Sequence, residues 1–285
     1  MEEFNIADLK KLYIPQSASH KGQNGKLMII GGSVLFHAAS LWSLKIASRI
    51  VDMVFYSSIN SNNIIVQKQK EEFRDGIVVP RDKIKHYIGE ADVVLIGPGL
   101  PRENGIEKGD DDTKILTQTL LQKYEDKKWV VDAGSLQVID PSILPQNSII
   151  TPHRKEFETI KLKSQNSKVK TAIQNLNLEE QIQIFAKEYK CIVLLKGERD
   201  IISDGSRIIE VKGGNAGMTK GGTGDVLAGL VAAFYCKNDA FLSASAASYI
   251  NKKAAEKLYK KVGFYFNTSD LADEIPKVMK EFILT

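Results

Sequence analysis

Short apolar runs alternate along the chain with longer segments in which apolar and polar residues share a helical spacing. Short apolar runs bounded by glycine, proline or polar residues predict buried strands, and the helical spacing predicts helices. The predicted strands are Leu27–Ile30, Val54–Ser57, Ile64–Val66, Val93–Ile96, Trp129–Val131, Ile149–Ile150 and Cys191–Leu195. The predicted helices are Ala38–Ile50, Ile115–Tyr124, Arg154–Leu162, Leu178–Tyr189 and nearly all of the chain from Thr223 onward. Strands that alternate with helices predict an α/β fold with a mostly parallel sheet covered by helices on both faces.

One further segment departs from this alternation. Residues Ile201–Val211 predict a β-hairpin that turns at Asp204-Gly205, which adds an antiparallel edge to the sheet. The sequence shows no internal repeat and no long linker. We therefore expect a single domain over residues 1–285, a length that α/β sheets often fill as one unit.

Two polar runs, Lys108–Asp112 and Lys161–Lys170, predict surface loops. The first ends in three consecutive aspartates, Asp110–Asp112, which suit either a metal site or the start of a helix. Acidic residues are favoured at a helix start by the helix dipole, and we prefer that interpretation.

The composition excludes some classes of function. Hydrophobic residues make up 43% of the chain and charged residues 26%, as in an ordinary globular protein. The net charge of +4 weakly favours anionic ligands and does not indicate nucleic acid, for which a strongly basic face is expected. Residues Met1–Lys11 lack the apolar core of a signal peptide, and no apolar run approaches the ~20 residues of a membrane span. Cys191 and Cys236 form no CxxC pair, so we expect two buried, reduced cysteines in a soluble, cytoplasmic protein.

The strongest functional signal is the glycine-rich stretch Gly213–Asp225, which stands directly before a predicted amphipathic helix, Val226–Phe234. Its spacing is not that of a Walker A loop. Gly222, Thr223 and Gly224 predict an anion hole, because glycine lets backbone N–H groups approach a phosphate and a helix start adds unpaired donors. Asp225 would repel that phosphate in a site for binding alone. It suits a general base acting on a hydroxyl that attacks the phosphate, which we prefer to an ordinary acidic residue at a helix start.

Three side chains at other strand ends join this stretch, because ligands bind at the carboxyl ends of strands in open parallel sheets. Lys196 follows a buried strand, where it can reach a phosphate or belong to a charged loop. His153 opens a helix and is either structural or, as we prefer beside the other clusters, a substrate contact. Asp132 can hold Mg²⁺ through water or cap a helix, and both readings stay open.

Glycines flank two other predicted strands. The segment Lys21–Lys26 precedes the first strand and Gly31-Gly32-Ser33 follows it, while Gly97-Pro98-Gly99 ends another strand. These glycines either leave room for a ligand or form ordinary tight turns, and we expect the ligand.

Together and in this order, the motifs resemble those of the ADP/ATP-dependent NAD(P)H-hydrate dehydratase family, which has a ribokinase-like fold. The resemblance covers nearly the whole chain. It is carried by Lys21-Gly22, Gly31-Gly32-Ser33, Ile96–Leu100, Thr151-Pro152-His153, Lys196-Gly197, Gly221–Gly229, Thr268–Leu271 and Ile275-Pro276. The Gly-Thr-Gly-Asp segment alone is typical of the wider kinase-like superfamily, and its combination with Gly-Pro-Gly and Thr-Pro-His is more specific.

The resemblance implies a lyase that repairs a damaged nicotinamide cofactor. Such an enzyme phosphorylates the C6 hydroxyl of the S form of NADH or NADPH hydrate with ADP or ATP, aided by Mg²⁺, and phosphate then leaves. Asp225 would deprotonate the hydroxyl, and the backbone at Gly222, Thr223 and Gly224 would stabilise the transferring phosphoryl group. The implied nucleotide contacts are Lys196, Gly197, Glu198, Arg199, Asp200 and Gly224. The implied contacts to the hydrate are Ala38, Gly99, His153 and Asp225.

The chain departs from the family pattern in three places. Gly134 stands where the family usually has a second aspartate, and His37 replaces a glycine before Ala38, which can narrow the hydrate pocket. Lys220 stands where many members have a small or polar residue, and it can add a phosphate contact. Two rival functions are an alcohol kinase on the same fold and a nucleotide-binding sensor without turnover.

The family is often tetrameric, and the alanine-rich region after Phe241 permits close helix packing. We therefore expect a homo-oligomer, although the same alanines also suit packing within one chain. We expect no nucleic-acid partner and no membrane.

Overall fold

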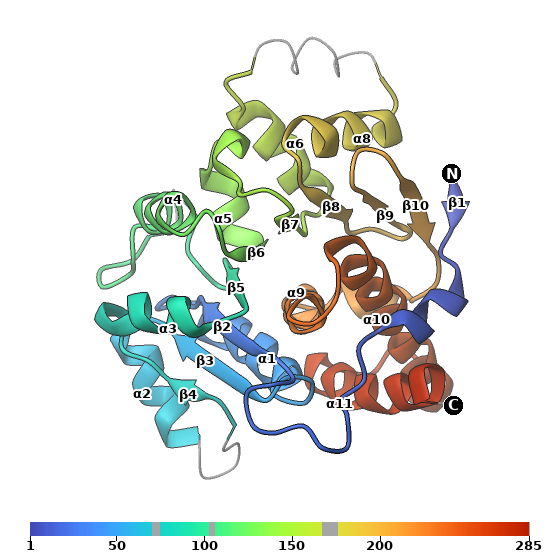
Figure 1. Ribbon diagram of the computed structural model, residues 1–285, viewed down its shortest axis with the longest axis horizontal. Helices are drawn as coiled ribbons and strands as arrows, with labels where there is room; N and C mark the ends of the chain where they lie inside the picture. Colours follow the sequence, from blue (N-terminus) through green and yellow to red (C-terminus); the bar gives the residue numbers. More distant parts are fainter. Residues whose placement is uncertain (70–74, 103–105, 167–175, 285) are drawn as a thin grey trace.

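A single curved sheet organises the computed structural model, which describes residues 1–69, 75–102, 106–166 and 176–284. Within these residues ten strands form one sheet in the order β1-β10-β9-β8-β7-β6-β5-β2-β3-β4 (Figure 1). The strands are β1 (Glu2–Glu3), β2 (Lys26–Ile30), β3 (Met53–Ser57), β4 (Ile77–Val78), β5 (Val93–Ile96), β6 (Lys128–Val131), β7 (Ile149–Ile150), β8 (Ile192–Leu195), β9 (Asp200–Ser203) and β10 (Ile208–Val211).

The strand directions place one set of strand ends together. Strands β4, β3, β2, β5, β6, β7 and β8 pair in parallel, so their carboxyl ends share one edge of the sheet. Strand β9 runs antiparallel between β8 and β10, as the predicted hairpin requires. The hairpin is not the edge of the sheet, contrary to our expectation, because Glu2 and Glu3 add a short strand parallel to β10.

The helices cover both faces of the sheet. The α-helices are α1 (His37–Ala47), α2 (Asn60–Gln69), α3 (Ile84–Glu90), α4 (Thr113–Lys123), α5 (Ala133–Val138), α6 (Arg154–Lys163), α8 (Leu178–Glu188), α9 (Thr223–Tyr235), α10 (Ala240–Val262) and α11 (Thr268–Met279). Shorter 3-10 helices span Ile6–Lys11, Arg81–Lys83, Pro141–Ile143 and Ala216–Thr219, and a π-helix spans Lys280–Leu284.

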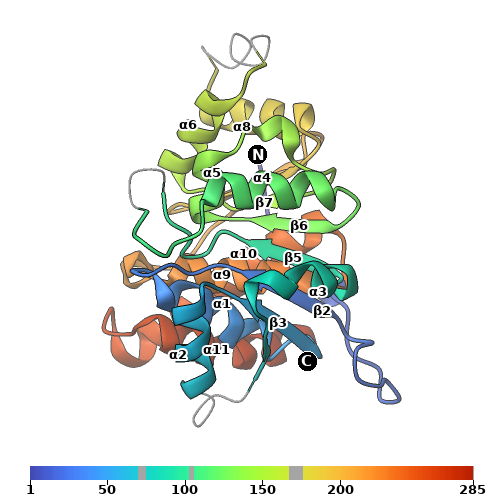
Figure 2. The same ribbon diagram turned by 90° about the vertical axis from the view of Figure 1, so that its left-hand side faces the viewer.

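The strands alternate their side chains between two apolar clusters. Leu27 and Ile29 of β2 join the cluster formed with α1, α9, α10 and α11. Met28 and Ile30 join the cluster formed with α3, α4, α5, α6 and α8. Successive side chains of a strand point to opposite faces, so a strand buried on both faces is apolar throughout. The sheet curves around α9 and α10 (Figure 1), and α4 and α5 lie beside β6 on its outer face (Figure 2).

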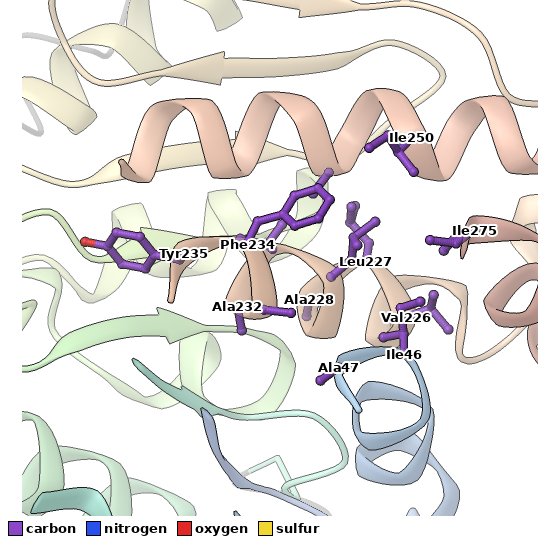
Figure 3. Packing of buried hydrophobic residues seen from close by; sticks show 14 of the residues in the cluster. Ile46, Ala47, Val226, Leu227, Ala228, Ala232, Phe234, Tyr235, Ile250 and Ile275 are labelled. Carbon is purple, nitrogen blue, oxygen red and sulfur yellow. The ribbon is translucent and has the colours of Figure 1, made fainter. Parts of the chain in front are cut away.

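Helix α9 is the most enclosed helix of the inner layer. Every residue from Val226 to Tyr235 is buried, so the prediction of an amphipathic helix is wrong. In Figure 3, α1 lies below α9, α10 with Ile250 lies above it, and Ile275 lies to its right. A helix that is apolar all round is stable only inside a core. The start of α9 is therefore held from several sides.

Other differences from the predicted elements are local. The segment predicted as a strand at Ile64–Val66 lies inside α2. Asp112 caps α4 by accepting a hydrogen bond from the N–H of Ile115, which confirms the helix-start interpretation of the acidic run. The first part of the run Lys161–Lys170 is the end of α6 rather than a loop, and residues 167–170 lie outside the described part of the chain.

The two cysteines are buried, as predicted. Burial raises the pKa of the Cys191 thiol to about 12 and also raises the pKa of Cys236. Neither thiol is therefore suited to act as a nucleophile near neutral pH. Among the helices of the described residues, none is both long and apolar enough to cross a membrane.

Candidate active site

Asp225 lies in the first turn of α9, where the glycine-rich stretch ends. Gly222, directly before the helix, has a φ of 97°, a left-handed conformation that favours glycine. A Cβ at Gly222 would also lie 2.3 Å from Cε3 of Trp42 in α1. Ser43 of α1 donates a hydrogen bond of 2.7 Å to the carbonyl of Asp225. Both contacts fix the start of α9 against α1.

The Asp225 carboxyl has a strongly shifted pKa. Burial is the largest cause, and the negative charge of Asp132 adds to it, so the pKa of Asp225 rises from 3.8 to about 7 despite the opposing charge of Lys196. A group with this pKa is partly deprotonated at neutral pH and can exchange a proton readily. Such a pKa suits acid–base chemistry, and the role of Asp225 as a general base stays a prediction.

Lys196, with 18% of its side chain exposed, and the buried Asp132 form an ion pair beside Asp225. Nζ of Lys196 lies 2.9 Å from Oδ1 of Asp132, which also accepts a hydrogen bond of 2.7 Å from Thr151 Oγ1. Burial alone would lower the pKa of Lys196, but the charges of Asp132 and Glu156 outweigh it and the pKa is raised. Lys196 is therefore a cation at the site. Asp132 stands directly before α5, but its side chain makes no hydrogen bond that caps this helix. The interpretation of Asp132 as a helix cap is wrong.

Lys196 also reaches the start of α9. A Cβ built on Gly224 would lie 3.5 Å from Nζ of Lys196. No side chain of the described residues caps the amino end of α9. The first N–H groups of a helix have no partner within the helix and can bind an anion. The N–H of Thr223 already donates to the carbonyl of Lys220 at 3.4 Å, so it would have to exchange that bond for one to an anion. Thr223 does not offer its hydroxyl, since Oγ1 donates to the carbonyls of Met218 and Lys220.

His153 has a structural role at the start of α6. Its Nδ1 accepts a hydrogen bond of 3.1 Å from the N–H of Glu156, whose carboxylate accepts from the N–H of His153. This reciprocal capping box satisfies two backbone donors. The side chain of His153 is still 47% exposed. Contact with a substrate through its other ring atoms stays a prediction.

The glycines after β2 and β5 are needed for close contact between chain segments. A Cβ at Gly31 would lie 2.3 Å from the carbonyl oxygen of Pro98, and one at Gly97 would lie 1.8 Å from that of Asp132. Gly99, with a φ of 72°, lies against the carbonyl of Phe36. Ala38 is half-buried in the first turn of α1, on the chain segment that follows Phe36. These contacts bring Gly99 and the start of α1 together, and they explain the glycines without a ligand.

The segment Lys21–Lys26 does not belong to this edge of the sheet. It leads into β2, whose first residue is Lys26, and therefore lies at the opposite ends of the parallel strands. The N–H groups of Gly22 and Asn24 donate to Oδ2 of Asp52, and Gly25 packs against Val51 and Cys236. The segment is a tight, hydrogen-bonded turn, and our expectation of ligand space there is wrong.

The stretch Lys196–Asp200 runs from the end of β8 to the first residue of β9. Gly197, Glu198 and Arg199 are exposed, whereas Asp200 is buried. Arg199 is engaged by two carboxylates, with Nη2 at 2.6 Å from Glu179 and Nη1 at 3.0 Å from Glu210. The side chain of Asp200 is directed into the protein, where burial raises its pKa against the charge of Lys252. Gly197, Glu198 and Arg199 are thus the residues of this stretch that a nucleotide can reach.

The structure also gives reasons for two departures from the family pattern. A Cβ at Gly134 would lie 2.2 Å from the carbonyl oxygen of Leu100, so no side chain fits there. Lys220 donates to the carbonyl of Phe264 and lies over the ring of Phe266 at 5.1 Å, so its ammonium has partners in the protein, and a phosphate contact stays a prediction. His37 is exposed at the start of α1.

Sequence reasoning missed two members of this site. Thr151 and Glu156 belong to the motif around His153, but we assigned neither a role. Thr151 orients Asp132, and Glu156 adds to the negative charge around Lys196. Their position in the sequence could have indicated them, since Thr151 directly follows β7 at the edge of the sheet where the site lies.

The described residues offer no protein-built magnesium site. They contain no group of three or more His, Cys, Asp or Glu side chains that could hold a metal ion. Asp132, the candidate from the sequence, has Oδ1 occupied by Thr151 and Lys196. These residues do not fit a metal held by the protein alone.

Solved structures with this architecture define the class of the fold. A ribokinase-like superfamily protein from Enterococcus faecalis aligns with a TM-score of 0.83 and 20% identity, over 100% of this chain and 97% of that one. The ADP/ATP-dependent NAD(P)H-hydrate dehydratase from Bacillus subtilis, co-crystallised with ATP and Mg²⁺, aligns with a TM-score of 0.77 and 21% identity, over 99% and 98% of the two chains. The chain therefore has a ribokinase-like fold, as predicted.

Sequence comparisons give the family. The family model described as NAD(P)H-hydrate dehydratase matches residues 27–277. The ADP-dependent (S)-NAD(P)H-hydrate dehydratase of Nitrosopumilus maritimus is 34% identical over 96% of both chains. A bifunctional NAD(P)H-hydrate repair enzyme of Methanocaldococcus jannaschii is 38% identical over 96% of this chain, which spans about half (52%) of that relative. The chain belongs to the NAD(P)H-hydrate dehydratase family, which confirms the resemblance seen in the sequence.

Proposed function

We propose that this protein is an ADP- or ATP-dependent dehydratase that restores NADH or NADPH from the S form of its hydrate. Residues 1–285 would act as one domain, consistent with the single continuous sheet. The observation that carries the proposal is the position of Asp225, a carboxyl with a pKa of about 7 beside a cation and an uncapped helix start.

The first step is phosphoryl transfer to the hydrate. Asp225 takes the proton of the C6 hydroxyl as the hydroxyl oxygen attacks the terminal phosphorus of the nucleotide. The bond from that phosphorus to its bridging oxygen breaks, so AMP leaves when ADP is the donor and ADP leaves when ATP is the donor. Backbone N–H groups at Gly222, Thr223 and Gly224 would face the transferring group, because preorganised donors stabilise developing charge. The N–H of Thr223 would leave the carbonyl of Lys220 to do so. Lys196, held at this end of α9 by Asp132, offsets the same charge.

In the second step the C6–O bond breaks and phosphate leaves with the bonding electrons. The neighbouring ring carbon gives its proton to water, and the electrons of that C–H bond restore the double bond of the reduced nicotinamide. Mg²⁺ would arrive with the nucleotide phosphates and neutralise part of their charge, since Mg²⁺ commonly binds through substrate phosphates.

The nucleotide would lie along Lys196–Asp200 and Gly224. The hydrate would contact Ala38, Gly99, His153 and Asp225. We further propose that the protein is a homo-oligomer and expect a tetramer, because members of the family are often tetrameric. The alanines that motivated that expectation are buried within one chain, for example Ala244 and Ala254 of α10, so the oligomer needs another surface.

The proposal is tested by product analysis. The pure protein is incubated with NADH hydrate, Mg²⁺ and either ADP or ATP, and absorbance of the reduced nicotinamide is followed together with free phosphate. A nucleotide-dependent rise with an equal amount of phosphate supports the dehydratase. A stable phosphoester without recovered NADH would point instead to an alcohol kinase.

A further inference from the structure

A buried lysine, Lys252 of α10, lies behind the nucleotide stretch. Its side chain is only 4% exposed. Nζ donates to the carbonyls of Gly197 at 3.1 Å, Glu198 at 3.0 Å and Gly213 at 3.4 Å. It also lies 3.3 Å from Oδ1 of Asp200. One ammonium group therefore gathers four oxygen atoms in the interior.

These oxygens come from two different connections. Gly197 and Glu198 belong to the turn between β8 and β9, which is our proposed nucleotide contact, and Asp200 is the first residue of β9. Gly213 begins the glycine-rich connection that runs from β10 to the start of α9. Lys252 is thus a single cation that joins the nucleotide turn to the segment leading to the anion hole.

The same face of α10 holds both connections at other points. Ser248, one turn before Lys252, donates a hydrogen bond of 2.7 Å to Oδ2 of Asp200. Glu256, one turn after it, accepts a hydrogen bond of 3.2 Å from the N–H of Gly214. Residues four apart lie on one face of a helix. A Cβ at Gly214 would lie 3.4 Å from Cγ of Lys252, so the glycine connection rests directly on this face.

We propose that Lys252 is a positioning residue that holds the nucleotide turn and the glycine-rich connection in their nucleotide-binding arrangement. This inference rests on the proposed function. Three carbonyl oxygens and a carboxylate repel one another when they converge without a cation, and a buried carboxylate left alone is costly. Removal of the ammonium would therefore separate the two connections. Lys252 touches no reacting group, so its loss should weaken nucleotide binding more than it slows chemistry.

The test compares Lys252→Ala with the wild-type protein in the hydrate assay. We expect the KM for ADP or ATP to rise by about 30-fold or more, the lower end of the effect of breaking a buried charge pair at a binding site. The KM for the hydrate should change much less, and kcat at saturating nucleotide should stay within a few-fold.

Ammonium or methylammonium chloride should restore nucleotide affinity, because a small cation can enter the vacated space. Tetramethylammonium chloride at the same ionic strength should not. The matched control is Lys260→Ala, an exposed lysine two turns later on α10, which should leave both KM values unchanged.

Circular dichroism establishes whether each variant is folded. If Lys252→Ala is not, Lys252→Arg decides the question, because its planar guanidinium keeps the charge but cannot meet four oxygens in the same arrangement. A folded variant with an unchanged nucleotide KM overturns the inference, as does an equal loss for nucleotide and hydrate. A wild-type protein that binds nucleotide without converting the hydrate contradicts the proposed function alone. Calorimetric Kd values for the nucleotide then replace KM in the same comparison.

Discussion

Replacing Asp225 by asparagine should make the protein more stable at alkaline pH. The folded structure holds the pKa of Asp225 at about 7, against 3.8 for a free side chain. With this sign, the carboxyl contributes stability that is fully present below pH ~4 and is lost as the pH rises through ~7. Asparagine resembles the protonated form and carries no such penalty.

The magnitude follows from the size of the shift. A shift of about 3 units at ~1.4 kcal/mol per unit gives an upper limit of roughly 4 kcal/mol. Most of the penalty develops above pH 5. We therefore expect the stability difference between Asp225→Asn and wild type to grow by about 3 kcal/mol from pH 5 to pH 8.5.

Urea unfolding followed by circular dichroism at both pH values measures this difference. Asp82→Asn is the control, since Asp82 is an exposed carboxylate, and its effect should stay within about 0.5 kcal/mol at either pH. A difference for Asp225→Asn that is the same at pH 5 and pH 8.5 would refute the claim that the folded protein raises this pKa.

Three further predictions concern the surroundings of the site and the assembly. Lys196→Met leaves the buried carboxylate of Asp132 without its cation, so urea unfolding should show a loss of about 3–5 kcal/mol, and a loss below 1 kcal/mol would contradict the ion pair. Gly222→Ala places a Cβ against Trp42 at a positive φ, so its free energy of unfolding should fall by about 2 kcal/mol or more in the same assay. Gly221→Ala has open space around it and should lose less, and equal losses would contradict this packing. Light scattering at micromolar concentration should give the mass of a homo-oligomer, and a monomer mass would reject that expectation.

The strands of the core could be predicted because burial on both faces makes them apolar throughout. Val93–Ile96 is a strand with the predicted bounds and is fully buried. The same rule misled us at Ile64–Val66, where three apolar residues in a row belong to a helix. In that helix Val66 is buried and Ile64 is exposed. A short apolar run does not distinguish the two structures, since the same three residues can form a buried strand or the buried side of a helix, as Val66 does against the inner core cluster.

The chemistry of the site could be predicted only in part. The glycines before Asp225 predicted an anion hole, because closely spaced glycines before a helix start form a local pattern that the sequence shows directly. The pairing of Lys196 with Asp132 joins residues 64 positions apart, and no local pattern indicates it. Lys252 was missed for the same reason, although a lysine among the small, buried residues of α10 is a signal that can be sought in other sequences.

The most direct test of the catalytic claim compares turnover of NADH hydrate by wild type and by Asp225→Asn. Both are measured at saturating nucleotide, with nucleotide affinity determined separately by calorimetry. If Asp225 is the base, kcat in the variant falls by roughly 10²–10⁴-fold, the usual contribution of such a group, while nucleotide affinity is retained. Unchanged turnover in the variant would contradict the assignment of Asp225 as the catalytic base.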